Sequence, residues 1–108
     1  MVSQPSPRYR VVPGTPLRIE LDGEIDYAAR ADLAATLALV TAVDPADITV
    51  DLAGVSYLAS EGLAFLVGLN NQVAPGHRVT LASPQPIVAR VLQISGFASV
   101  FSVEPIAA

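Results

Sequence analysis

Hydrophobic and polar residues alternate along Leu17 to Asp26, and this period of two predicts a β-strand with one buried face. The next stretch changes to a helical period, and we expect its helix to end before the Asp44-Pro45 pair. Asp26 or its neighbour is placed to cap that helix, because a carboxylate there accepts hydrogen bonds from unpaired N–H groups. The apolar residues of this predicted helix form one stripe along it, made of Ala29, Leu33, Leu37 and Val40.

Shorter apolar runs predict the other elements. Further strands are expected at 8–12, 48–52, 78–81 and 101–103, and one helix at about 62–73. Another helix is expected to start within Ser83 to Pro86, to contain Ile87 to Ile94 and to be closed by Ser95-Gly96. The order β-β-α-β-α-β-α-β predicts an α/β fold with a mixed sheet of four to five strands, since alternating elements pair strands in parallel through right-handed crossovers. The opening pair is expected to be antiparallel. Residues 1–7 are predicted to be a flexible tail and residues 8–108 a single domain.

Composition narrows the class of protein. With 108 residues the chain can build one core, and 52% of them are hydrophobic while only 15% are charged. This balance predicts either a heavily buried sheet or an apolar patch on the surface. The net charge is -4 and all six basic residues are Arg, so we expect no nucleic-acid binding. The chain has no Cys, which excludes disulfides and thiolate metal sites.

Location is predicted from what the N-terminus and the apolar runs lack. The first residues hold no apolar core segment of the kind that signal peptides have. The apolar runs are far shorter than the ~20 residues of a membrane span. We therefore expect a cytoplasmic protein that does not insert into a membrane.

Ser60 lies in the stretch Tyr57 to Gly62, between two apolar runs, and allows three interpretations. It is placed to be a helix N-cap, for which Ser is favoured. As a nucleophile it has little support, because Leu58 stands where the G-x-S-x-G elbow has glycine and the single His, His77, lies in a distant turn. As a phosphorylation site it fits well, since a helix N-terminus tolerates an anion while nearly two added charges would disturb a bound partner.

The helix that follows Ser60 is apolar on most sides. Between Leu52 and Gly76 the single charged residue is Glu61, and the apolar residues surround the helix rather than lining one face. Such a helix is either deeply buried or covered by a partner, and the sequence leaves both possibilities open. The acidic residues of the alternating strand are a second candidate. For Glu20 and Asp22 we favour plain solubility over acid–base or metal chemistry, because no closed pocket is indicated.

Three segments in this order resemble the STAS domain family, in particular the bacterial anti-sigma-factor antagonists. They are Asp22 to Asp26, Val50 to Leu66 and Val88 to Phe101, and the resemblance covers nearly the whole chain after the tail. It implies a STAS-like mixed sheet with about three helices packed mainly on one side, no catalysis and no cofactor. It also implies partner switching: the unphosphorylated antagonist binds an anti-sigma factor, a serine kinase of the histidine-kinase-like ATPase fold, and a phosphatase later resets the phosphorylated form.

The family's phosphorylation loop reads Asp-Ser-Ser/Thr-Gly, and this chain has Ala59-Ser60-Glu61-Gly62 at that place. Ser60 therefore falls on the phosphorylated position, while the acid before it is lost and a fixed negative charge follows it. In the family the segment Asp22 to Asp26 lies beside the same loop. The resemblance implies no metal site and a partner-binding surface made of Asp22, Glu24, Asp26, Ala59, Ser60, Glu61, Gly62, Leu63 and Phe65.

Two other classes of function stay open. A non-switching STAS subunit, docked on a transporter ATPase or in a multi-STAS scaffold, is favoured by Ala59 and Glu61, because a permanent partner needs no kinase site. An enzyme would need a pocket of convergent polar groups, and the sequence indicates none.

Overall fold

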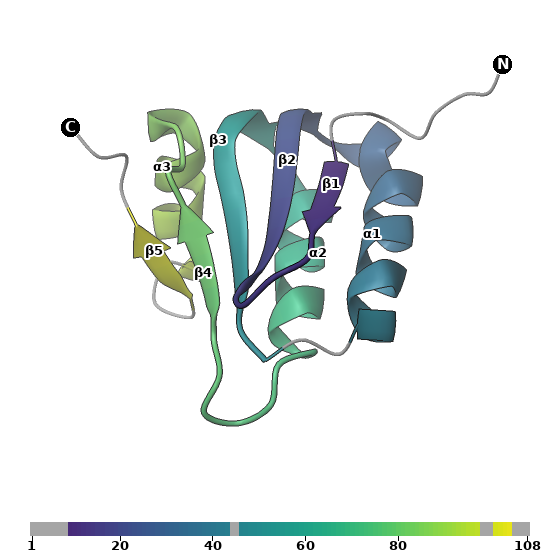
Figure 1. Cartoon of the computed structure of the whole chain (residues 1–108). Helices are drawn as coiled ribbons and strands as arrows, with labels where there is room; N and C mark the ends of the chain where they lie inside the picture. Colours follow the sequence, from purple (N-terminus) through teal and green to yellow (C-terminus); the bar gives the residue numbers. More distant parts are fainter. Residues whose placement is uncertain (1–8, 44–45, 98–100, 105–108) are drawn as a thin grey trace, which may run out of the picture.

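The computed structural model describes residues 9–43, 46–97 and 101–104 (Figure 1). The predicted tail at 1–7, and Arg8 of the first predicted strand, lie outside these residues. The five strands are β1 (Tyr9–Val12), β2 (Leu17–Ile25), β3 (Ile48–Leu58), β4 (Val79–Ala82) and β5 (Ser102–Glu104). The helices are a 3-10 turn, η1 (Tyr27–Ala29), and α1 (Arg30–Val43), α2 (Ser60–Asn70) and α3 (Pro86–Ile94). The α/β class and the predicted order of elements are confirmed.

The five strands form one sheet in the order β1-β2-β3-β4-β5. β1 is antiparallel to β2, and each later pair is parallel. Each parallel pair is joined through a helix, as short right-handed crossovers require. The carboxyl ends of β2, β3 and β4 therefore share one edge of the sheet, the upper edge in Figure 1, where α1, α2 and α3 begin.

One face of the sheet is buried under the helices and the other is polar. In β2, Leu17, Ile19 and Leu21 are at most 4% exposed, whereas Arg18 and Glu20 between them are half-buried. The three long helices lie behind the sheet in Figure 1 and supply the other half of the core. Their buried hydrophobic residues are Leu33, Val40, Phe65, Leu66, Leu69, Val88 and Leu92.

Ion pairs tie the strands together on the polar face. Arg18 contacts Asp51 on the neighbouring strand at 2.6 Å, and Glu20 accepts from both Arg10 at 2.7 Å and Arg18 at 3.2 Å. These side chains are partly exposed, so each pair contributes at most about 1 kcal/mol. The acidic residue Glu20 is thus a structural partner, in keeping with a solubilising face.

The third strand is longer than the sequence predicts. β3 continues from Leu52 to Leu58, because Val55 and Leu58 are buried and pair with Gly23 and Ile25 of β2. The strict alternation ends at Leu52, because the pairing shifts register between Glu20 and Asp22 and again between Gly23 and Glu24, so that the next buried residues of β3 come three apart. As a consequence the predicted turn from Tyr57 onward shrinks to the single residue Ala59.

Candidate functional site

Ser60 is the first residue of α2, and its side chain is exposed at the upper edge of the sheet. The prediction that Ser60 is the N-cap is wrong, because Ala59 holds that position with extended backbone angles of φ −96° and ψ −176°. The carbonyl of Ala59 accepts from the N–H groups of Gly62 at 3.0 Å and Leu63 at 3.2 Å. The side chain of Ala59 makes no capping hydrogen bond, and the Ser60 hydroxyl donates to Oε1 of Glu61 at 3.4 Å. That hydroxyl therefore has no role in holding the helix.

The end of β2 lies directly against this loop. The N–H of Ala59 donates to the carbonyl of Ile25 at 2.8 Å, and Ile25 pairs with Leu58 in the sheet. Asp26 follows and caps η1 by accepting from the N–H of Ala28 at 3.0 Å, which confirms its predicted capping role. The expected neighbourhood of the 22–26 segment and the Ser60 loop is thus confirmed.

The remaining acidic residues of that segment point away from the core. Asp22 and Glu24 are exposed, and they pair in register with Gly54 and Tyr57 of β3. They lie on the strand beside the one that leads into Ser60, and Asp26 lies closest to the start of α2. The acidic residues therefore border the site on its β2 side.

The first turns of α2 face mostly inward. Gly62 is buried, and a Cβ there would collide with Leu58 and lie 2.9 Å from Cγ2 of Ile25. Phe65 is only 5% exposed and belongs to the core, while Leu63 is half-buried and packs against it. Most of the apolar character of α2 is thus used for packing. Of the nine residues expected to bind a partner, Gly62 and Phe65 are therefore the two that are buried.

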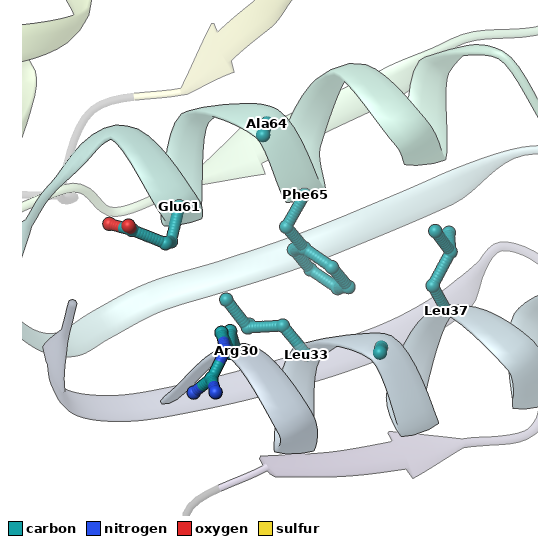
Figure 2. Close-up of a pocket in the computed structure, with 7 residues that line it drawn as sticks. Arg30, Leu33, Leu37, Glu61, Ala64 and Phe65 are labelled. Atoms are coloured by element: carbon teal, nitrogen blue, oxygen red, sulfur yellow. The ribbon is translucent and has the colours of Figure 1, made fainter. Parts of the chain in front are cut away.

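A groove runs between α1 and α2, and Arg30 and Glu61, the residue after Ser60, lie at one end of it (Figure 2). Its volume is about 280 Å³, and we call it the α1–α2 groove. The residues from α2 are Glu61, Ala64 and Phe65, spaced three and four apart so that they share one face. The sequence analysis missed the residues on the other wall, although the apolar stripe of α1 already contained two of them. That wall consists of Arg30, Leu33, Ala34 and Leu37.

Two exposed tyrosines flank the same edge of the sheet and were also missed. Tyr57 is 47% exposed at the end of β3, and Tyr27 is 62% exposed at the start of η1. The guanidinium carbon of Arg30 lies 4.2 Å from the centre of the Tyr27 ring, a cation–π contact. Their positions in the sequence could have identified them, because each tyrosine lies at the carboxyl end of a strand and within three residues of the start of a helix.

His77 belongs to the opposite edge of the sheet. It precedes β4, whose first residue pairs with Ile48, whereas Ser60 follows the far end of β3, roughly 30 Å away at 3.3 Å per strand residue. This separation excludes a Ser60–His77 catalytic pair. At that edge Nδ1 of His77 lies 3.2 Å from Oδ1 of Asp47. A hydrogen bond from the backbone N–H of Arg78 at 2.9 Å, assisted by His77, lowers the pKa of Asp47.

Metal and membrane features were sought among the residues that the structure describes. In those ranges no three His, Asp or Glu side chains are grouped closely enough to hold a metal ion. Within the same ranges, none of the helices combines the length and the apolar character that a membrane span requires.

Comparison with known proteins gives a family and several relatives. The family model described as "Mlab, STAS domain" matches residues 12–103. A STAS-domain containing protein of Pseudomonas aeruginosa (strain UCBPP-PA14) is 31% identical over 91 residues, which cover 83% of this chain and 89% of the relative.

Solved structures with the same fold include two anti-sigma-factor antagonists. The one from Mycobacterium paratuberculosis has a TM-score of 0.79 and 21% identity, over 98% of this chain and 92% of the other. The unphosphorylated form of SpoIIAA has a TM-score of 0.73 and 21% identity, over 88% and 86% of the two chains.

Proposed function

This chain belongs to the STAS domain family, and we propose that it is an anti-sigma-factor antagonist regulated by phosphorylation of Ser60. The observation that carries the proposal is the exposed hydroxyl of Ser60 on the first turn of α2, in a fold shared with solved antagonists. In this proposal the unphosphorylated chain binds an anti-sigma factor that is a serine kinase and so frees the sigma factor. Phosphorylation by that kinase ends the complex, and a phosphatase restores binding.

The position of Ser60 suits a reversible modification. A phosphate on this residue needs no rearrangement of the core, because the hydroxyl is exposed and does not cap the helix. The N-terminus of α2 also favours a negative charge through its helix dipole. A bound partner would meet nearly two additional negative charges beside Glu61 and would have to desolvate them. The modification therefore changes the surface and leaves the domain folded.

The lost acid of the phosphorylation loop has a substitute in this structure. Ala59 offers no acceptor to the target hydroxyl, but Oε1 of Glu61 accepts from it at 3.4 Å. A carboxylate therefore still lies beside Ser60, on the following residue rather than the preceding one. At 3.4 Å this contact is longer than an ordinary O–H···O hydrogen bond, so Glu61 replaces the lost acid only in part.

The proposal is tested by identifying the partner and then transferring phosphate. The tagged chain is captured from its own cell and its stoichiometric partner is identified by mass spectrometry. The purified pair is then incubated with ATP, and the intact mass of this chain is measured. We expect a kinase-type anti-sigma factor and the gain of one phosphate, which is absent in Ser60→Ala and retained in the matched exposed-serine control Ser56→Ala. A partner of another class, or phosphate on Ser60→Ala, would contradict the proposal.

Ala59 and Glu61 favour a second candidate, a non-switching STAS subunit. In that role the chain docks permanently on a transporter ATPase or in a multi-STAS scaffold, and Ser60 is an ordinary surface residue. Capture of a transporter ATPase, with equal binding by the parent protein and Ser60→Ala, would establish this alternative.

A further inference from the structure

The α1–α2 groove has an apolar floor that the described residues, 9–43, 46–97 and 101–104, leave open. Leu33, Ala34 and Leu37 line it from α1, and Ala64 and Phe65 from α2 (Figure 2). It remains open because Ala34 and Ala64 are too small to fill the space between the helices, and both are exposed.

The two helices close the groove at one end. At the far end the helices approach closely, since a Cβ on Gly68 of α2 would lie 3.1 Å from Cδ2 of Leu37 on α1. At the near end lie Arg30 and Glu61, and Glu61 directly follows Ser60 (Figure 2).

Arg30 and Glu61 carry opposite charges at the same end of the groove, yet they form no ion pair. Among residues 9–43, 46–97 and 101–104, no salt bridge includes either of them. The stacking of Arg30 on Tyr27 holds the guanidinium at the rim. Each charge is thus available to a group that comes from outside, a carboxylate for Arg30 and a cation for Glu61.

The dimensions of the groove fit a side chain of a protein partner better than a whole small molecule. Ligand pockets commonly have volumes of about 300–1,000 Å³ and enclose most of the ligand, whereas this groove has about 280 Å³ and is open to solvent. An amphipathic helix laid into a groove buries single apolar side chains as anchors, with its charges at the rim.

A second copy of this chain fits poorly. The most exposed apolar helical residue is Ile94 at 77%, on α3, and the single charge of α3 is the cation Arg90. The exposed Leu39 and Val43 lie on a part of α1 that has no charge after Asp32. Neither of these two helix faces has a carboxylate beside its exposed apolar residues that could form an ion pair with Arg30.

We infer that the α1–α2 groove docks an amphipathic helix of a partner protein, which inserts one large apolar side chain and places a carboxylate at Arg30 and a cation at Glu61. The inference rests on the proposed function in that a phosphate on Ser60 adds negative charge at the mouth of the groove. The inference goes beyond the proposed function because it specifies the partner's binding segment, a helix with one large apolar side chain, a carboxylate and a cation.

A photo-crosslinking amino acid tests the inference in the full chain, in its own cell. It is placed at Ala64 in the groove, and at Ala35 as control, because Ala35 is exposed on α1 but does not line the groove. We expect a protein adduct from position 64 alone, mapped to a helix with an apolar residue flanked by an acid and a base. An adduct to a second copy of this chain, or to no protein, would overturn the inference.

The affinity of the purified, crosslinked partner is then measured by titration calorimetry. Ala64→Arg, which fills the groove, is expected to weaken binding by at least about tenfold, while Ala35→Arg stays within about twofold. Arg30→Glu is expected to weaken binding too, and reversal of the partner's acidic residue should restore it. Should Ala64→Arg fail to fold, Ala34→Arg fills the groove from the other helix. Unchanged affinity in the folded groove variant would refute the inference.

The two proposals fail separately. A crosslinked helix from a protein that is not a kinase would refute the proposed function and leave the groove inference standing. A kinase that phosphorylates Ser60 but gives no adduct at position 64 would support the proposed function and refute the groove inference.

Discussion

The N–H of Ala59 donates a hydrogen bond of 2.8 Å to the carbonyl of Ile25, and this bond joins the end of β2 to the start of α2. The contact places Ser60 one residue beyond a fixed point of the sheet. The side chains of Ile25 and Leu58 also meet at Gly62 in the first turn of the helix. The candidate phosphorylation site is therefore an exposed residue on a rigid base.

Gly62→Ala should destabilise the domain. The new Cβ would collide with Leu58 and lie 2.9 Å from Ile25, and such overpacking costs about 1–3 kcal/mol, offset by up to about 1 kcal/mol of helix propensity. Urea denaturation should show a lower free energy of unfolding. Gly68→Ala is the matched control on the same helix, since its Cβ meets only the flexible end of Leu37, and it should stay within about 1 kcal/mol of the parent. Equal stability of the two variants would contradict the packing described for Gly62.

Ala59→Ser should stabilise the domain. Ala59 holds the N-cap position with extended backbone angles, and a serine hydroxyl there can accept from the unpaired N–H groups of the first turn. Such a cap contributes about 0.5–2 kcal/mol. Thermal unfolding followed by circular dichroism should show a higher Tm. Ser60→Ala should leave the Tm nearly unchanged, and a large loss in that control would mean that Ser60 does cap the helix.

Ser60→Asp should weaken the binding of the captured partner by about tenfold or more, about 1.4 kcal/mol, because the added charge must be desolvated at the interface. The affinity is measured by titration calorimetry with the purified proteins. Asn71→Asp adds the same charge at the other end of α2, about 16 Å away at 1.5 Å per residue, and should bind like the parent. Loss of affinity in both variants would indicate a general charge effect rather than an interface at Ser60.

Asp47→Asn should change how stability depends on pH. The hydrogen bond from the N–H of Arg78, with help from His77, lowers the pKa of Asp47 from its ordinary value of 3.8. A carboxylate with a lowered pKa in the folded state contributes stability above its unfolded value, and the contribution is lost as the pH falls through the folded value. The parent should therefore have a higher free energy of unfolding than Asp47→Asn at neutral pH. In urea titrations this difference should become smaller as the pH is lowered to about 3. A gap that stays constant would mean that the charge of Asp47 plays no part.

Several elements were predictable because their patterns are local. The alternation of Leu17, Ile19 and Leu21 identified β2, and the carboxylate of Asp26 identified the start of the following helical segment. The extension of β3 was not predictable, since two register shifts in its pairing with β2 break the period of two after Leu52, and such shifts depend on the neighbouring strand. The N-cap was misassigned by one residue for the same reason: the strand runs further than its own pattern shows.

The sequence by itself determined the α/β class, the order of the elements and the place of Ser60 beside an apolar helix, because periodicity and turn residues act over short distances along the chain. The tertiary structure alone decided which apolar residues remain accessible. Phe65 is buried against the sheet, whereas Ala34 and Ala64 leave a groove between two helices that are distant in sequence. The exposure of a side chain and its ion pairs depend on contacts between segments that are distant in sequence. The place of Arg30 at the groove therefore follows from the packing of α1 beside α2 and not from the local sequence.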